Sequence, residues 1–179
     1  LDSNTIRNLE LLSSLGTKDK DYTLFSLLNQ TKTPMGSRLL KNWIIRPLLN
    51  QQKIKERQEG VREFYDDRNL SESIGEKLDS ISDLERLSGK LGYGKANPKD
   101  LIGLKESLKV IPEIRNALQV AKSSILKEIS VNLPEVSDIV KLIEDSIVDD
   151  PSLSLTEGGI IRKGFDQGLD DLKKDVSEN

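Results

Sequence analysis

The apolar residues along most of the chain recur at the spacing of one helix face. Between residues 34 and 47 they fall at Met35, Leu39, Leu40, Trp43 and Ile44, a period typical of an amphipathic helix. Thr33 is a favourable N-cap, and Pro34 is tolerated at the first helical position because its missing N–H would have no helical partner there. Pro47 cannot continue the helix and disfavours helical dihedrals at the preceding residue. The pattern predicts a helix that starts at Pro34 and stops before Pro47, with Arg46 outside helical dihedrals.

The same period predicts further helices downstream. One follows Pro47 and carries Ile54, Val61, Phe64 and Tyr65, and another carries Leu84, Leu87 and Leu91 and ends in the glycines of "GYGK". A long helix is predicted from Asn97-Pro98 to Leu118, with a kink at Pro112. Others start at Pro134 and near Phe165. The predicted fold class is therefore all-α, built from many helices.

Two segments depart from the helical period. The first, "LDSNTIRNLELL" at residues 1–12, has no clean period and is predicted to be extended. The second alternates Leu153 and Leu155, turns at Gly158-Gly159 and resumes with two isoleucines. It predicts a minor short strand or hairpin near 153–161.

Gly36 is unexpected in the first turn of a predicted helix, because glycine there costs stability relative to alanine. A residue without a side chain suggests that another backbone approaches closely. Arg38, Lys41 and Arg46 give the same helix a basic side. A solvated face is the ordinary interpretation of such residues, and contact with another domain is the functional one.

Composition narrows the possible chemistry. Aromatic residues are 4% of the 179, so the core is expected to consist of Leu, Ile and Val. The chain contains no cysteine and no histidine, which removes thiolate and imidazole metal ligands and the commonest general base. The 27 basic and 30 acidic residues give no basic stripe of the kind that a nucleic-acid-binding face needs.

Two motifs resemble reactive sites and fail on inspection. Gly89, Gly94 and Lys95 have the spacing of a phosphate-binding loop, but Ala96 replaces the hydroxyl that would reach magnesium, and a helical pattern precedes the motif where a strand is required. The acidic pairs at 66–67, 149–150 and 170–171 are best explained as surface or helix-start charges. No catalytic, cofactor or metal residue is predicted in this chain.

No apolar run approaches membrane-spanning length, and no signal-peptide pattern is present at the N-terminus. The chain begins at Leu1 without a methionine and ends within a helical pattern. We therefore expect an internal segment of a longer protein, with no membrane partner.

Five blocks occur in an order that resembles the core (lever) domain of the MutS family of DNA mismatch-repair proteins. They are "LDSNTIRNLELL", "TLFSLLNQTKTPMGSRLLKNWIIRPLL", "DLERLSGKLGYGKANPKDL", "VIPEI" and "DDPSLSLTEGGIIRKGFDQGLDDLK". Together they cover nearly all of the chain, from Leu1 to about Lys173.

This resemblance implies that residues 1–179 are the first part of the core domain. The mismatch-binding, connector, clamp and ATPase domains would lie outside the chain. ATP and magnesium would bind the parent's ATPase domain and nothing in this segment, which would not itself be an enzyme. Through the parent, the implied partners are the other domains of its chain, mismatched double-stranded DNA, a second subunit in a homodimer, and MutL. The parent would be a cytoplasmic bacterial protein that acts at the nucleoid.

In this interpretation the segment couples the ATPase state to the DNA clamp, and its functional residues are interdomain or structural. The candidates from the family-like blocks are Arg7, Asn8, Glu10, Pro34, Gly36, Arg38, Trp43, Pro47, Gly158 and Gly159. The alternatives are a stand-alone helical adaptor that binds proteins, which an exposed apolar groove would favour, and a nucleic-acid-binding helical domain. The isoelectric point of about 5.2 argues against the second alternative.

Overall fold

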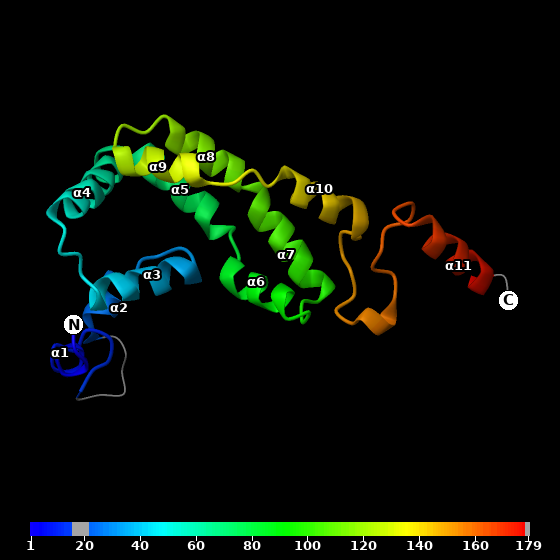
Figure 1. The fold of residues 1–179 in the computed structure, drawn as a ribbon, viewed down its shortest axis with the longest axis horizontal. Helices are drawn as coiled ribbons and strands as arrows, with labels where there is room; N and C mark the ends of the chain where they lie inside the picture. Colours follow the sequence, from blue (N-terminus) through cyan, green and yellow to red (C-terminus); the bar gives the residue numbers. More distant parts are fainter. Residues whose placement is uncertain (16–21, 178–179) are drawn as a thin grey trace. The chain divides into compact units, whose positions relative to one another are not determined.

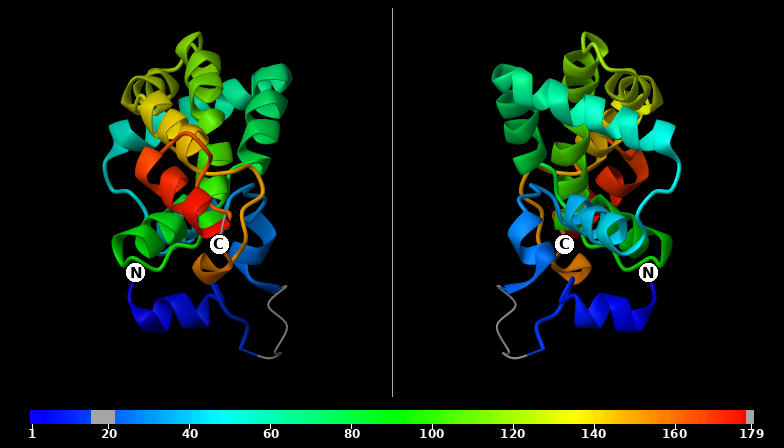
Figure 2. Two further views of the ribbon diagram at one scale, coloured as in Figure 1. Left: turned by 90° about the vertical axis from the view of Figure 1, so that its right-hand side faces the viewer. Right: turned by 90° about the vertical axis from the view of Figure 1, so that its left-hand side faces the viewer.

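A computed structural model describes residues 1–15 and 22–177 of the chain, which fold into a series of helices (Figures 1 and 2). The elements are α1 (Ser3–Asn8), α2 (Leu24–Leu28), α3 (Pro34–Ile45), α4 (Gln51–Asp66), α5 (Arg68–Asp79), α6 (Leu84–Gly92), α7 (Pro98–Lys109), α8 (Ile111–Gln119), α9 (Ser124–Asn132), α10 (Ser137–Ser146), the 3₁₀ turn η2 (Leu155–Glu157) and α11 (Gln167–Ser177). Within these described ranges the chain forms no strand, so the all-α prediction is confirmed.

The helices belong to two compact units. Unit 1 combines Leu1–Asp83 with Glu113–Leu133, and unit 2 combines Leu84–Pro112 with the chain from Pro134 onward. In unit 1, α4 packs against α5 and α9, and α2 packs against α3. In unit 2, α7 packs against both α6 and α10.

The core is aliphatic, as the low aromatic content predicted. The buried apolar residues in the described ranges are leucine, isoleucine, valine and one alanine. The centre of unit 2 is formed by Ile143, Ile147 and Ile160, against which the apolar face of α7 packs through Leu101, Ile102 and Leu104. Burial of aliphatic side chains is therefore the main stabilising contribution in this protein.

The predicted helix after Thr33 forms with the predicted caps. The Thr33 hydroxyl accepts a hydrogen bond from the N–H of Gly36 at 3.0 Å, and Pro34 occupies the first turn. The helix ends at Ile45, and Arg46 leaves helical dihedrals ahead of Pro47, as predicted. Local cap chemistry thus sets both ends of α3.

The first twelve residues are not extended, and that prediction is wrong. Ser3–Asn8 form α1, which starts on the side chain of Asp2: its carboxylate accepts from the N–H of Thr5 at 2.9 Å. A helix of six residues is shorter than two turns, so it shows too little periodicity for the pattern to reveal it.

The long helix expected from Pro98 to Leu118 is interrupted instead of kinked. α7 ends at Lys109, and the N–H of Val110 turns back to the carbonyl of Leu108. α8 then starts at Ile111, which places Pro112 in its first turn. A proline inside one continuous helix would lack a donor and collide with the preceding turn. Restarting the helix just before Pro112 avoids both costs.

The strand or hairpin predicted near 153–161 does not form. The segment contains the 3₁₀ turn η2 and contributes only one residue, Ile161, to an isolated antiparallel bridge with Ile147. The predicted turn at Gly158 and Gly159 is confirmed, with φ of 72° and 68°. Such dihedrals favour glycine, and they direct the chain back toward the end of α10.

Candidate interdomain surfaces

The N-terminal candidates Arg7, Asn8 and Glu10 lie at the end of α1. Glu10 has a φ of 48°, in the left-handed region, and is the only non-glycine residue there in the described part of the chain. Its N–H donates to the carbonyl of Arg7 at 3.0 Å, and the next N–H, of Leu11, donates to Ile6 at 3.1 Å. These two bonds form a Schellman motif with Glu10 at the position that glycine usually occupies.

The side chain of Glu10 has a separate role. Its carboxylate accepts from the backbone N–H of Leu15 at 2.6 Å, and the backbone carbonyl of Leu11 accepts from the N–H of Phe25 in α2 at 3.0 Å. Asn8 and Arg7 remain exposed. The first block is therefore held in unit 1 by backbone bonds and by one strained acidic residue.

Arg38 is engaged inside unit 1. Its guanidinium donates two parallel hydrogen bonds to the carboxylate of Asp83, at 3.0 and 2.7 Å. Lys32, just before α3, pairs with Asp79 at 2.9 Å. The bidentate geometry orients α3 against the residues that follow α5. Arg38 thus has a structural partner within this chain.

Gly36 is not required by the close approach of another backbone, so that prediction is wrong. A Cβ atom at Gly36 would lie 3.1 Å from the hydroxyl oxygen of Thr33 and 3.3 Å from Cβ of Thr31, so its close neighbours are side chains and not another backbone. Gly36 leaves room for the hydroxyl that caps α3. The glycine at a close helix crossing is Gly60, which sequence reasoning missed.

Gly60 is buried in α4, where this helix packs against α9. A Cβ atom there would lie 2.8 Å from Cγ2 of Ile125. That methyl group is attached directly to the Cβ of a β-branched residue, which has one strongly preferred rotamer in a helix. An isolated glycine inside a helical pattern was the available sequence signal for this contact.

Glu63 fastens the same two helices one turn further along α4. Its carboxylate accepts from the backbone N–H groups of Lys122 and Ser123, the latter at 2.7 Å, and so caps the start of α9. Partial burial opposes the charged form, but these donors outweigh it and hold the pKa of Glu63 below its usual value. We call Gly60, Glu63, Ser123 and Ile125 the α4–α9 clasp.

Trp43 and Pro47 line an apolar groove between the end of α3 and one face of α4. The other apolar residues of this groove include Ile54, Val61 and Tyr65. The guanidinium of Arg57 lies over the Trp43 ring, 3.7 Å from its centre, an attractive cation–π arrangement. Two of the sequence-predicted candidates are therefore brought together on a single surface, which we call the Trp43 groove.

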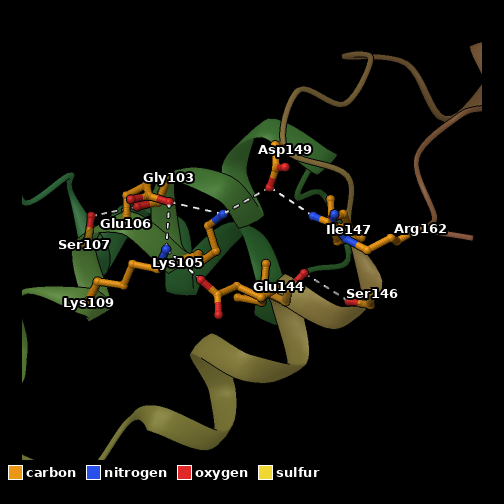
Figure 3. A network of polar contacts seen from close by, with 11 residues as sticks. Gly103, Lys105, Glu106, Ser107, Lys109, Glu144, Ser146, Ile147, Asp149 and Arg162 are labelled. Carbon is orange, nitrogen blue, oxygen red and sulfur yellow. Dashed lines mark hydrogen bonds and ion pairs between the residues drawn. The ribbon is translucent and has the colours of Figure 1, made fainter. Parts of the chain in front are cut away.

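In unit 2, charged side chains from α7 and the 149–162 region meet beside the core (Figure 3). Lys105 is 5% exposed, and its ammonium group lies 3.1 Å from Glu106 and 3.9 Å from Asp149. Arg162 donates to the same Asp149 carboxylate at 2.9 Å and to the carbonyl of Ile147 at 3.0 Å. Asp149 thus connects α7 to the chain that follows the glycine turn.

A second ion pair connects α7 to α10. The Nζ atom of Lys109 lies 2.6 Å from Oε1 of Glu144. Their hydrogen bond is the main influence that raises the pKa of Lys109 and lowers the pKa of Glu144. The Lys109 side chain is 42% exposed, so its charged end stays near water while its stem covers apolar surface. The Lys105, Asp149 and Arg162 network was not predicted, because its members are far apart in sequence.

The loop that resembles a phosphate-binding motif is a helix end. Gly94 has a φ of 62°, its N–H donates to Leu91 at 3.0 Å, and the N–H of Lys95 donates to Lys90 at 2.8 Å. These bonds form a Schellman motif, and they occupy amide donors that a phosphate cradle would need. The interpretation as a glycine-rich helix end before the Asn97 cap is confirmed.

Among the residues that the structure describes, no group of three or more acidic side chains is placed to hold a metal ion. No helix in those ranges is both long and apolar enough to cross a membrane.

Comparison with known proteins matches the chain to one protein family. A family model described as MutS domain III matches residues 4–179. The chain is 42% identical over 172 residues to the DNA mismatch repair protein MutS of an Exiguobacterium species, covering 96% of this chain and 20% of that protein. It is 43% identical over 178 residues to the MutS of Caldanaerobacter subterraneus, covering 99% of this chain and 20% of that protein. The chain therefore spans about a fifth of the length of these relatives.

Proposed function

Because the chain belongs to the MutS domain III family, we propose that it is the first part of the core, or lever, domain of a DNA mismatch-repair protein. In such a protein the segment precedes the clamp and couples the nucleotide state of an ATPase domain to the grip on DNA. The observation that carries this proposal is the family match over residues 4–179, and the fold supplies the physical reasoning.

A lever must hold its helices in fixed relative positions within each rigid part. The α4–α9 clasp does this in unit 1 through a close glycine crossing and a carboxylate cap. The Lys105, Asp149 and Arg162 network does it in unit 2. Such contacts support the proposal because they stiffen each unit, and the proposed role needs no reactive groups in this segment.

The wider protein supplies the chemistry in this proposal. ATP and magnesium would bind its ATPase domain, and mismatched DNA would be read by a domain outside this segment. Other domains of the same chain are the immediate partners, with a second subunit and MutL as partners of the whole protein. The Trp43 groove also suits the alternative of a stand-alone helical adaptor, since adaptors bind partners through exposed apolar surface.

A chimera tests the proposal and separates it from the adaptor. Residues 1–179 would replace the matching segment of the Caldanaerobacter subterraneus protein, to which they are 43% identical. We expect the chimera to bind mismatched duplex and to hydrolyse ATP faster when that duplex is present. A control with a flexible linker in place of the segment should lose this stimulation. A folded chimera that keeps DNA binding and basal hydrolysis but shows no stimulation would contradict the proposal.

A further inference from the structure

Apolar side chains of the Trp43 groove remain exposed to solvent in the folded unit 1. Val61 is 66% exposed and Tyr65 82% exposed, and both lie on the face of α4 that also carries Ile54. Gly60 and Glu63 lie on the opposite face, where α9 packs. One face of α4 is therefore covered by α9, and the face that carries Val61 and Tyr65 remains an exposed apolar surface.

The charged side chains that line the groove are all basic. Two arginines, Arg57 and Arg62, line it, and no acidic residue does, although 30 of the 179 residues are acidic. The sequence from Tyr22 to Lys55 contains six basic residues and no acidic one. An apolar surface with this surround favours a partner that carries apolar and negative groups together.

Two of those six basic residues are neutralised within the chain. Lys32 pairs with Asp79 and Arg38 with Asp83. The other four are Lys41, Arg46, Lys53 and Lys55, and no ion pair within the described ranges engages them. Arg57 makes its contact with the Trp43 ring instead. Arg62 lies within 3.6 Å of the carboxylate of Asp66, so the positive charge that a partner can engage is mainly that of the four residues without an ion pair in the described ranges.

We propose that the Trp43 groove docks an amphipathic helix whose polar face is acidic. A helix placed in a groove between two helices buries its apolar side chains at successive turns. Tryptophan, tyrosine and arginine are the residues that most often dominate such binding, and Trp43, Tyr65 and Arg57 provide them here. This inference is drawn from the surface alone and does not depend on the proposed function.

A nucleic acid suits the groove less well. Phosphate contacts use basic groups and bury little aliphatic surface, whereas the floor of the groove includes Ile54 and Val61. Bases stack on open aromatic faces, but the Arg57 guanidinium already covers one face of Trp43. A helical protein segment uses both the apolar floor and the basic surround.

Trp43 is the only tryptophan in the chain, so its fluorescence reports binding at this groove. The probes would be an 18-residue amphipathic helical peptide with glutamates on its polar face and a twin with lysines in their place. We expect the acidic peptide to shift Trp43 emission to shorter wavelength in a saturable way. The lysine twin should bind at least about tenfold more weakly, equivalent to about 1.4 kcal/mol.

Two substitutions locate the effect. Val61→Asp should reduce the affinity for the acidic peptide by about tenfold or more. Val131→Asp should leave it unchanged, since Val131 is a solvent-exposed valine on α9 (83% exposed) that does not line the groove. Arg62→Glu should weaken binding of the acidic peptide and strengthen binding of the lysine twin. Circular dichroism would verify that each variant keeps its helices.

Three results would overturn the proposal. They are equal affinity for the two peptides, undiminished binding to the Val61→Asp variant, and tighter binding of a single-stranded oligonucleotide than of the acidic peptide. None of these results bears on the chimera experiment, so the two proposals can fail separately.

Discussion

The carboxylate of Glu63 in α4 accepts a hydrogen bond from the backbone N–H of Ser123, 60 residues later in the chain. Ser123 directly precedes α9 and supplies no side-chain cap of its own. A helix start leaves backbone donors unpaired unless something accepts from them. Glu63 therefore completes α9 from another helix, and its removal should affect both helices.

Replacing Glu63 with glutamine should lower the free energy of unfolding by about 1–2 kcal/mol at pH 7, because a charged acceptor at a helix start is replaced by a neutral one. Urea melts would measure it. Glu59→Gln, an exposed change on the same helix, is the matched control and should change stability by less than about 0.5 kcal/mol.

The stability difference between the wild type and Glu63→Gln should depend on pH. The pKa of Glu63 is lowered in the folded state relative to 4.5, because the Lys122 and Ser123 donors outweigh the opposing effect of burial. Its contribution to stability is therefore present above about pH 4.5 and is lost as the pH falls through the folded pKa. The difference between wild type and Glu63→Gln should shrink at pH 3. An undiminished difference at that pH would contradict the cap.

Gly60→Ala should destabilise unit 1 even though alanine is the better helix former. The new Cβ would lie 2.8 Å from Cγ2 of Ile125, and overpacking costs about 1–3 kcal/mol against a helix-propensity gain of up to about 1 kcal/mol. Gly75→Ala is the control: nothing lies within 4 Å of its Cβ position in α5, so it should stabilise. Thermal melts in which the two variants shift the same way would disprove the close crossing.

The parts of the fold that local chemistry determines could be predicted from sequence, as α3 shows. Its start and end follow from Thr33, Pro34 and Pro47. α9 was not predicted, because its cap comes from Glu63 in another helix. The bridge between Ile147 and Ile161 likewise depends on where tertiary packing brings two distant segments. Trp43 was a candidate, but its stacking on Arg57 required the position of α4.

This chain should not bind ATP. The amide groups of Gly94 and Lys95 are used within the helix end, and Ala96 offers no hydroxyl for magnesium. Calorimetric titration with magnesium-ATP should give no saturable heat. Micromolar binding by the 179-residue chain would contradict this assignment.

The chain should also bind mismatched and perfect duplexes equally weakly. Non-specific affinity depends on phosphates neutralised by basic residues, and here 27 basic residues are offset by 30 acidic ones. Fluorescence anisotropy at physiological salt would measure both affinities. A several-fold preference of this chain for the mismatch would mean that it reads DNA itself.

The most direct test of the lever role measures coupling in the chimeric full-length protein. The measured quantity is the ratio of affinities for mismatched duplex without and with ATP. The logarithm of this ratio gives the coupling free energy between the nucleotide site and the DNA site. Loosening the α4–α9 clasp by Glu63→Gln should move this ratio toward one while leaving the affinity without nucleotide unchanged. Glu59→Gln should keep the ratio of the parent chimera. A ratio that is the same in all three proteins, although Glu63→Gln lowers the melting temperature, would contradict the account.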